Sequence, residues 1–290
     1  MANAYAAQLA GAGSISSTAE LTELTAWIMS DNSKPIVEMR DISKRYGGVQ
    51  ALQGVDLEIR TGEVHALVGD NAAGKSTLIK ILSGAVQRDE GSISFDGQPV
   101  EVASPRDAKA LGVETVYQDL ALADNLDVPA NIFLGRELTK GGAMSWFLDK
   151  RRMEKESRAL LQRLKINIPS IRQKVRTMSG GQRQSIAIAR CVCFNARVVI
   201  LDEPTAALGV EETRKVYDLI RDMRHHGVAV LLISHNLSHV FENCDRITVL
   251  KTGRLVGSRR AAETSREQIL RMIVTGNMEE PFSPVRAATV

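Results

Sequence analysis

Alternating apolar and polar residues predict short strands from residue 36 onward. Ile36–Arg40 and Val55–Ile59 alternate as half-buried strands do. Asp96-Gly97 lies between apolar residues of the segment 92–102, which predicts a hairpin. A second hairpin is predicted over Ile247–Ser258, with its turn at residues 251–253. These segments are expected to supply antiparallel strand pairs.

Two nearly all-apolar segments, Arg197–Leu201 and Val228–Ile233, predict strands that are buried on both faces, as in a parallel sheet. A helix is expected between them, over Glu211–Arg224. Another short apolar strand, Val64–Val68, precedes a helix predicted over Ser76–Leu82. The carboxyl ends of such strands are where ligands of open α/β sheets bind.

The chain divides into one long regular part and two shorter ends. Residues 1–34 are rich in Ala, Ser, Thr and Gly, and we expect a flexible extension with a short helix over Thr18–Met29. The regular pattern runs over residues 35–276 and leaves 277–290 as a tail. Residues 119–178 are more charged and more helical, which predicts a helical subdomain inserted into the strand-rich part.

A loop between a predicted strand and a predicted helix has the spacing of a phosphate-binding loop. Gly69–Ser76, called the phosphate loop below, matches G-x-x-x-x-G-K-[ST]. Its backbone N–H groups can converge on phosphate oxygens at a helix N-terminus. Lys75 adds positive charge, and the Ser76 hydroxyl is placed to ligate Mg²⁺. The residues expected to bind nucleotide here are Gly69, Asp70, Asn71, Ala72, Ala73, Gly74, Lys75, Ser76 and Thr77.

Charged side chains follow the two buried strands. Asp202 and Glu203 end the first, and we expect Asp202 to hold Mg²⁺ while Glu203 orients the attacking water. His235 follows the second strand, and we expect it to contact the γ-phosphate of ATP. Any one of these residues alone is compatible with an ordinary strand end. Together with the phosphate loop they predict a site that binds and hydrolyses ATP.

Ser179-Gly180-Gly181-Gln182, called the signature segment below, resembles the signature motif of ATP-binding-cassette (ABC) proteins. In that family the signature of one subunit closes on the ATP held by the phosphate loop of another, so all four residues are expected to bind nucleotide. The resemblance covers about residues 36–276. It implies an α/β fold with a P-loop NTPase core of the ABC ATPase type, a mixed sheet, an antiparallel β subdomain and an inserted helical subdomain.

The resemblance assigns roles to residues that the spacing alone does not distinguish. Gln118 corresponds to the family's Q-loop glutamine, which implies a contact with Mg²⁺ or the lytic water. Tyr46 falls where the family stacks an aromatic ring on adenine. His235 corresponds to its switch histidine.

Finer similarity points to ATPase subunits of monosaccharide importers. Ser104–Ala108, Gly112-Val113 and Asn131–Glu137 resemble that group, and a single cassette is similar to its shorter, fructose-type members. The resemblance implies a homodimer that closes on ATP, membrane permease subunits that dock around residues 118–134, and indirectly a sugar-binding protein. It also implies a cytoplasmic position on the inner face of the cell membrane.

Composition agrees with a globular chain in a reducing compartment. The chain is 44% apolar and carries a net charge of +3, which does not favour disorder or a nucleic-acid partner. Its three cysteines, Cys191, Cys193 and Cys244, do not form a disulfide framework. We find neither a run of about eighteen apolar residues nor a secretory signal, and therefore expect a cytoplasmic chain.

Two positions differ from the family pattern. Ala72 stands where most cassettes have glycine; if its φ is positive, alanine costs about 1–2 kcal/mol, roughly a tenfold effect on the nucleotide-competent state. Gly209 stands where the family has an aspartate that links the two sites. Two other functions stay open at this point: a soluble ABC-type ATPase acting on nucleic acid or ribosomes, and a nucleotide-binding regulator with low turnover.

Overall fold

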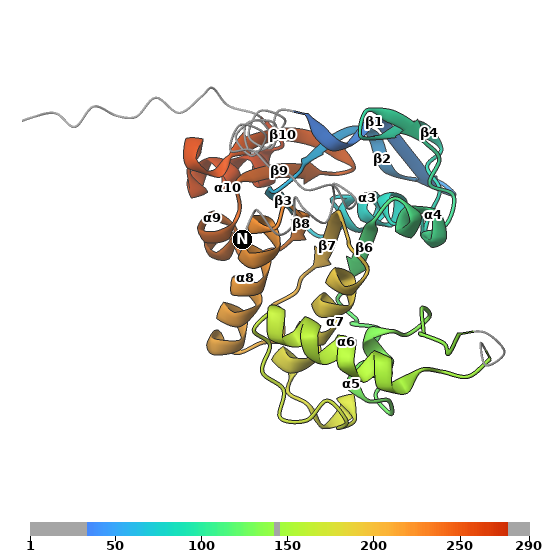
Figure 1. Cartoon of the computed structure of the whole chain (residues 1–290). Helices are drawn as coiled ribbons and strands as arrows, with labels where there is room; N and C mark the ends of the chain where they lie inside the picture. Colours follow the sequence, from blue (N-terminus) through green and yellow to red (C-terminus); the bar gives the residue numbers. More distant parts are fainter. Residues whose placement is uncertain (1–33, 142–145, 278–290) are drawn as a thin grey trace, which may run out of the picture.

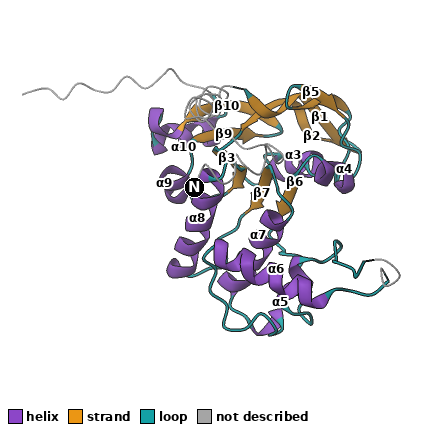
Figure 2. Ribbon diagram, in the orientation of Figure 1, coloured by secondary structure: helices purple, strands orange, loops and turns teal. Residues whose placement is uncertain are grey.

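The computed structural model describes residues 34–141 and 146–277, and these residues form two sheets with helices packed around them (Figure 1). The helix expected over Thr18–Met29, and nearly all of the N-terminal extension and the C-terminal tail, lie outside the described residues. Strands gather in the upper part of Figure 2 and the helices α5 and α6 in the lower part.

The smaller sheet is antiparallel, with the order β2-β1-β4-β5. Its strands are β1 (Pro35–Tyr46), β2 (Val49–Arg60), β4 (Glu90–Phe95) and β5 (Gln98–Val100). The hairpin expected at Asp96-Gly97 is the β4–β5 turn. β1 and β2 are longer than the expected strands because their pairing register shifts near Asp41, whose φ is 53°. Such an irregularity interrupts the alternation from which strand ends are predicted.

The larger sheet is mixed, with the order β10-β9-β3-β8-β7-β6. The pairs β9–β3, β3–β8, β8–β7 and β7–β6 are parallel, and β10 is antiparallel to β9. The strands are β3 (Val64–Val68), β6 (Val113–Val116), β7 (Val198–Asp202), β8 (Ala229–Ile233), β9 (Arg246–Lys251) and β10 (Arg254–Arg260). Both sheets therefore confirm the expected fold class.

Alternate residues of the central strands belong to two different apolar cores. Val199 and Leu201 of β7 pack on one face of the mixed sheet, with residues of α7 and α8. Val198 and Ile200 pack on the other face, with α3 and the antiparallel sheet. Burial on both faces explains why these strands are almost entirely apolar.

Helices pack on both faces of the mixed sheet. Three of them, α5, α6 and α7, lie in the connection between β6 and β7 (Figure 1). The α-helices are α3 (Lys75–Leu82), α4 (Pro105–Ala110), α5 (Val128–Ile132), α6 (Lys150–Arg163), α7 (Gly180–Cys193), α8 (Val210–His225), α9 (Leu237–Asn243) and α10 (Arg266–Thr275). Short 3-10 helices lie at Val175–Thr177 and Ala261–Glu263.

Side chains cap these helices where the sequence has the appropriate residues. The Asp149 side chain accepts the backbone N–H of Arg152 at the start of α6, at 3.0 Å. Ser265 and Gln268 form a capping box at the start of α10. Between β6 and β7, α5 and α6 are separated by long irregular segments.

Candidate functional site

The phosphate loop joins β3 to α3 along a path that requires glycine at both ends. Gly69 has a φ of 151°, and a Cβ there would lie 2.2 Å from the carbonyl oxygen of Leu250. Gly74 has a φ of 100°, and a Cβ there would lie 2.7 Å from a side-chain carbon of Leu52. The loop backbone thus runs directly against β9 and β2.

Backbone hydrogen bonds hold the middle of the loop. Ala73 donates its N–H to the carbonyl of Asp70 at 3.1 Å, and its own carbonyl accepts the N–H of Gly253 at 3.0 Å. Between Asp70 and Ala73, Ala72 has a φ of 63°. The condition set out for Ala72 therefore holds, because an alanine occupies the left-handed region that favours glycine.

Lys75 lies over the loop at the beginning of α3. Its Nζ donates to the carbonyl oxygens of Gly69 at 2.6 Å and of Asp70 at 2.8 Å. Burial lowers the pKa of the Lys75 ammonium, while the nearby Glu203 and Asp202 carboxylates act to raise it. The lysine charge is thus held between the phosphate loop and the end of β7.

Strand register brings the other expected residues to the same edge of the mixed sheet. Ile233 of β8 is level with Leu67 of β3 and with Asp202 of β7. Val116 of β6 is level with Leu201 of β7. Because these strands are parallel, the segments that follow them leave at one edge. The residues placed there are Gly69, Gln118, Asp202, Glu203 and His235.

Glu203 and His235 form a direct contact at this edge. The Oε2 of Glu203 lies 2.8 Å from the Nδ1 of His235. The Glu203 side chain is 18% exposed and that of His235 is 74% exposed, so the pair joins a half-buried carboxylate to an exposed ring. Glu203 has a φ of 50°, and its N–H donates to the Ile233 carbonyl at 3.0 Å. Glu203 thus leaves the extended backbone of β7 in a left-handed conformation.

The surroundings of Asp202 disfavour its ionised form, which a bound cation would stabilise. Burial and the adjacent Glu203 raise its pKa, and both effects disfavour its negative charge. Within the described ranges, no three His, Cys, Asp or Glu side chains group together as a complete metal site. Ser76 and Gln118 are exposed and offer oxygen ligands. This set fits Mg²⁺, which binds one or two carboxylates together with water and phosphate oxygens.

The signature segment forms the start of α7. Ser179 and Gln182 make a capping box, in which the Gln182 side chain accepts the Ser179 N–H at 3.1 Å and Ser179 Oγ accepts the Gln182 N–H at 3.2 Å. A Cβ at Gly180 would lie 3.1 Å from the Leu208 side chain. One at Gly181 would lie 2.9 Å from the Glu212 side chain. The two glycines therefore allow this helix start to pack closely against residues 207–212.

Tyr46 is the last residue of β1, in the smaller antiparallel sheet. Tyr46 is 46% exposed, and the Nζ of Lys44 lies 5.8 Å from the centre of its ring. A ring in this position is available for stacking.

Two residues contact the expected site although the sequence patterns do not single them out. Gly253, in the β9–β10 turn, binds the phosphate loop through Ala73. Glu212 contacts the signature segment and accepts the N–H of Gly209 at 3.4 Å. The sequence predicts the turn that contains Gly253, and Glu212 has the position of a helix-capping residue. Neither pattern indicates these long-range contacts. Gly209 itself has a φ of −70°, so its backbone does not require glycine.

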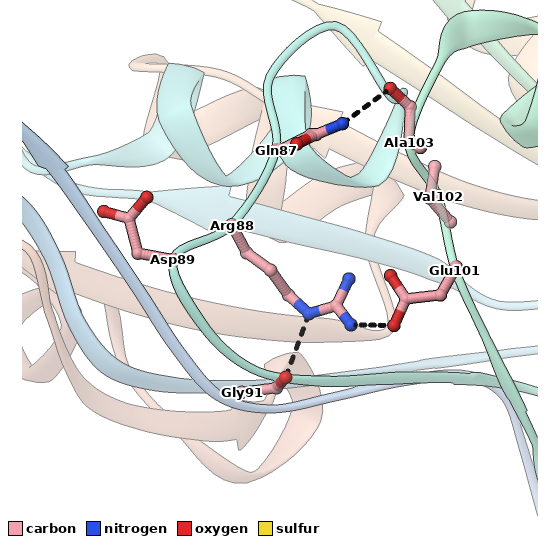
Figure 3. Close-up of a pocket in the computed structure, with 7 residues that line it drawn as sticks. All are labelled: Gln87, Arg88, Asp89, Gly91, Glu101, Val102 and Ala103. Carbon is pink, nitrogen blue, oxygen red and sulfur yellow. Dashed lines mark hydrogen bonds and ion pairs between the residues drawn. The ribbon is translucent and has the colours of Figure 1, made fainter.

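Two surface hollows lie away from the phosphate loop. One of about 240 Å³ lies between residues 87–91 and 101–103 (Figure 3). There Arg88 donates to the Gly91 carbonyl at 2.9 Å and to the Glu101 carboxylate at 2.7 Å, so its charge is already paired. The other, of about 460 Å³, is lined by residues that include Phe95 and Phe194. Neither hollow includes a residue of the expected nucleotide site.

Residues 52–206 match the family model described as "ABC transporter". The chain is 48% identical over 240 residues to the xylose/arabinose import ATP-binding protein XylG of Sulfolobus acidocaldarius, covering 83% of this chain and 94% of that protein. It is 51% identical over 225 residues to the fructose import ATP-binding protein FrcA of Rhizobium meliloti, covering 76% and 86% of the two chains.

Solved structures share the fold. A nucleotide-free ATP-binding cassette from an ABC transporter aligns with a TM-score of 0.72 at 22% identity, covering 83% of this chain and 96% of that one. A dimeric cassette in a post-hydrolysis state, bound to ADP and phosphate, aligns with a TM-score of 0.65 at 24% identity, covering 78% and 98%. None of the helices in the described part of this chain has the length and apolar character needed to span a bilayer.

Proposed function

The chain belongs to the ABC transporter family, and we propose that it powers import of a monosaccharide by binding and hydrolysing ATP at the carboxyl edge of its mixed sheet. The observation that carries this proposal is the convergence, through strand register, of the phosphate loop, the Asp202–Glu203 pair and His235. The similarity to sugar-import ATP-binding proteins supports the substrate class.

The phosphate loop binds the β- and γ-phosphates of ATP in this proposal. Backbone N–H groups at the start of α3 face the phosphate oxygens, and the helix N-terminus favours negative charge. Lys75 exchanges its bonds to the Gly69 and Asp70 carbonyls for bonds to phosphate. Tyr46 stacks on the adenine ring.

Ser76, Asp202 and Gln118 would hold Mg²⁺ together with phosphate oxygens, and the cation would supply charge neutralisation on the phosphates. Asp202 would then keep its negative charge more easily, because burial and the neighbouring Glu203 disfavour that charge.

Glu203 orients the attacking water. Its contact with His235 at 2.8 Å and its left-handed backbone fix the direction of the carboxylate. His235 is mostly exposed and reaches the γ-phosphate from the neighbouring strand end. Gln118 approaches the same water or the cation from β6. Glu203 thus serves as the base, His235 as a contact of the γ-phosphate, and Gln118 as a polar group that positions the water or the cation.

The second half of each site comes from another copy of the chain. The signature segment lies at the start of α7, and its contacts described above are to residues 207–212 rather than to the phosphate loop. A dimer in which each signature segment closes on the ATP of the other copy satisfies both halves. The dimeric cassette among the similar structures supports this arrangement.

The partners follow from the proposed import function. Integral membrane permease subunits dock around residues 118–134, where Gln118 links the docking region to the nucleotide. A sugar-binding protein acts indirectly, through the permeases. The chain then works as a peripheral subunit on the cytoplasmic face of the cell membrane, and no nucleic acid is expected.

The variant Glu203→Gln tests the proposal. We expect it to bind ATP, to dimerise on ATP, and to hydrolyse ATP at least about a hundredfold more slowly, because it keeps the shape of the side chain but removes the base. Glu211→Gln is the matched control: Glu211 is exposed, lies in α8 outside the strand edge, and should leave turnover unchanged. Turnover of the Glu203 variant close to that of the native chain would remove Glu203 from its central role.

A further inference from the structure

Two hairpin turns of the chain have nearly the same backbone but different surroundings. The β9–β10 turn has Thr252 and Gly253 at its centre, with φ values of 46° and 74°. The β4–β5 turn has Asp96 and Gly97 at its centre, with φ values of 52° and 73°. Positive φ at both central residues marks a type I′ turn, in which the second position favours glycine. Local conformation therefore explains both glycines equally well.

Contacts with the rest of the chain distinguish Gly253 from Gly97. A Cβ built at Gly97 meets no atom within 4 Å. A Cβ built at Gly253 would lie 2.7 Å from the carbonyl oxygen of Ala51 and 3.0 Å from its carbonyl carbon, both in the backbone of β2. Gln53 of the same strand donates its N–H to the Gly253 carbonyl at 2.7 Å. The β9–β10 turn thus lies so close to β2 that a side chain at residue 253 would collide with the strand backbone.

The phosphate loop meets the same part of β2. A Cβ built at Gly74 would lie 2.8 Å from the Ala51 carbonyl oxygen and 3.4 Å from the Cα of Gly253. Gly253 donates its N–H to the carbonyl of Ala73 at 3.0 Å. This glycine therefore joins β2 to the phosphate loop, because it accepts a hydrogen bond from Gln53 and donates one to Ala73.

The bond from Gly253 also fixes the direction of an N–H group in the phosphate loop. A trans peptide unit is planar, so the Ala73 carbonyl and the Gly74 N–H point in opposite directions. Because the carbonyl points at Gly253, the Gly74 N–H points away from the β9–β10 turn. Rotation of this peptide would exchange the two groups and present a carbonyl oxygen in place of the N–H. Loops of this kind bind phosphate through N–H groups, and a carbonyl oxygen would repel it.

We propose that Gly253 is a positioning residue of the nucleotide site, which holds the Ala73–Gly74 peptide so that its N–H faces the phosphates of ATP. This inference rests on the proposed function, in which the phosphate loop binds ATP. A side chain at residue 253 would move the turn away from β2, and the peptide would lose the donor that fixes it. The affinity for ATP should fall as a result, while the chemical step should change little, because this N–H serves the bound substrate and the transition state alike.

The test compares Gly253→Ala with the matched control Gly97→Ala, both in the Glu203→Gln background, in which hydrolysis is expected to be slow. Both variants place alanine at nearly the same positive φ, so both should lower Tm through backbone strain. At a temperature where both are folded, only Gly253→Ala should weaken binding of a fluorescent ATP analogue. We expect its Kd to rise about tenfold, the effect of about one lost hydrogen bond, and that of Gly97→Ala to change less than about twofold. A lower Tm with an unchanged Kd in Gly253→Ala would make Gly253 a purely structural residue and overturn the inference.

Inorganic tripolyphosphate separates the phosphate loop from the adenine contact. Because it has no adenine ring, its competition for the site should weaken by the same factor in Gly253→Ala. A weakening confined to ATP would place the effect at Tyr46 and count against the inference. In the otherwise native chain, Gly253→Ala should raise the KM for ATP about tenfold and change kcat less than about twofold. A lowered kcat at an unchanged KM would contradict a role in binding.

Hydrogen exchange of the Glu203→Gln parent keeps the inference testable if Gly253→Ala does not fold. The Gly253 N–H exchanges when its bond to the Ala73 carbonyl opens. Saturating ATP should slow this exchange at least about tenfold, because the open loop binds phosphate more weakly than the closed one. Equal exchange with and without bound ATP would overturn the inference and leave the proposed function intact. Failure of the parent to bind ATP at all would instead overturn the proposed function.

Discussion

The variant Ala72→Gly tests whether the backbone strain at Ala72 lowers the stability of the folded chain or its affinity for ATP. Ala72 has a φ of 63°, and this conformation costs a non-glycine residue about 1–2 kcal/mol. Protein contacts on both sides fix it: Ala73 donates to Asp70, and Gly253 donates to Ala73. We therefore expect the strain to reduce the stability of the folded chain rather than its affinity for ATP, and this replaces the tenfold effect on the nucleotide-competent state that the sequence suggested.

The magnitude follows from two opposing effects. Glycine removes the strain at residue 72. Its greater conformational entropy in the unfolded chain offsets about 0.4–1 kcal/mol of that gain. The net gain in the free energy of unfolding is about 1 kcal/mol or less, which corresponds to a rise in Tm of no more than roughly 2–4 °C for a domain of this size. The Kd for ATP should change by less than about twofold, since the backbone that meets the phosphates is the same in both variants.

Thermal unfolding and equilibrium binding of a fluorescent ATP analogue measure the two quantities separately. Ala121→Gly is a matched control, because Ala121 is also an alanine with positive φ, 48°, and lies outside the phosphate loop. It should raise Tm similarly and leave the Kd unchanged. An Ala72→Gly variant that binds ATP about tenfold more tightly, with no change in Tm, would refute the reasoning and place the strain in the nucleotide-bound loop.

Two further predictions concern histidines. His235→Ala should bind ATP normally but slow its hydrolysis about a hundredfold in a phosphate-release assay, because it removes both the partner of Glu203 and a γ-phosphate contact; unchanged turnover would contradict the role of this residue. Burial lowers the pKa of His65 from 6.5 to about 3. The unfolded chain therefore binds one more proton between these values, and stability falls as pH falls through this window, by about 2 kcal/mol at pH 5. Denaturant unfolding of His65→Gln should show this part of the pH dependence removed; an equal slope in both chains would exclude His65 as its source.

The central strands of the mixed sheet were the most predictable part of the fold. β7 and β8 differ from the predicted segments by one residue at either end at most. Burial on both faces leaves an uninterrupted apolar run, and the polar residue that ends it marks the sheet edge. The ends of β1 and β2 were less predictable, because the irregular pairing near Asp41 breaks the two-residue period.

The expected residues at the strand ends could be placed at one edge because parallel register follows from the strand pattern. The contacts of Gly253 and Glu212 could not be placed in this way. Gly253 meets Ala73 only because the β9–β10 turn folds over the phosphate loop, and Glu212 meets Gly181 only because α7 and α8 pack together. Such contacts depend on three-dimensional packing between elements far apart in the chain, which local patterns do not encode.

Lys75 and Glu203 of the proposed site already have partners within a single chain. Lys75 binds two carbonyls of its own loop, and Glu203 contacts His235. Glu212 accepts the N–H of Gly209 at the start of α8. In the proposed dimer, binding of ATP would therefore exchange hydrogen bonds rather than add them, and each exchange taken alone would yield little net free energy. A γ-phosphate that reaches Lys75, His235 and a second chain's Ser179 together makes all the exchanges at once. Closure of the dimer should accordingly depend on the whole triphosphate, which is the property an ATP-driven import cycle requires.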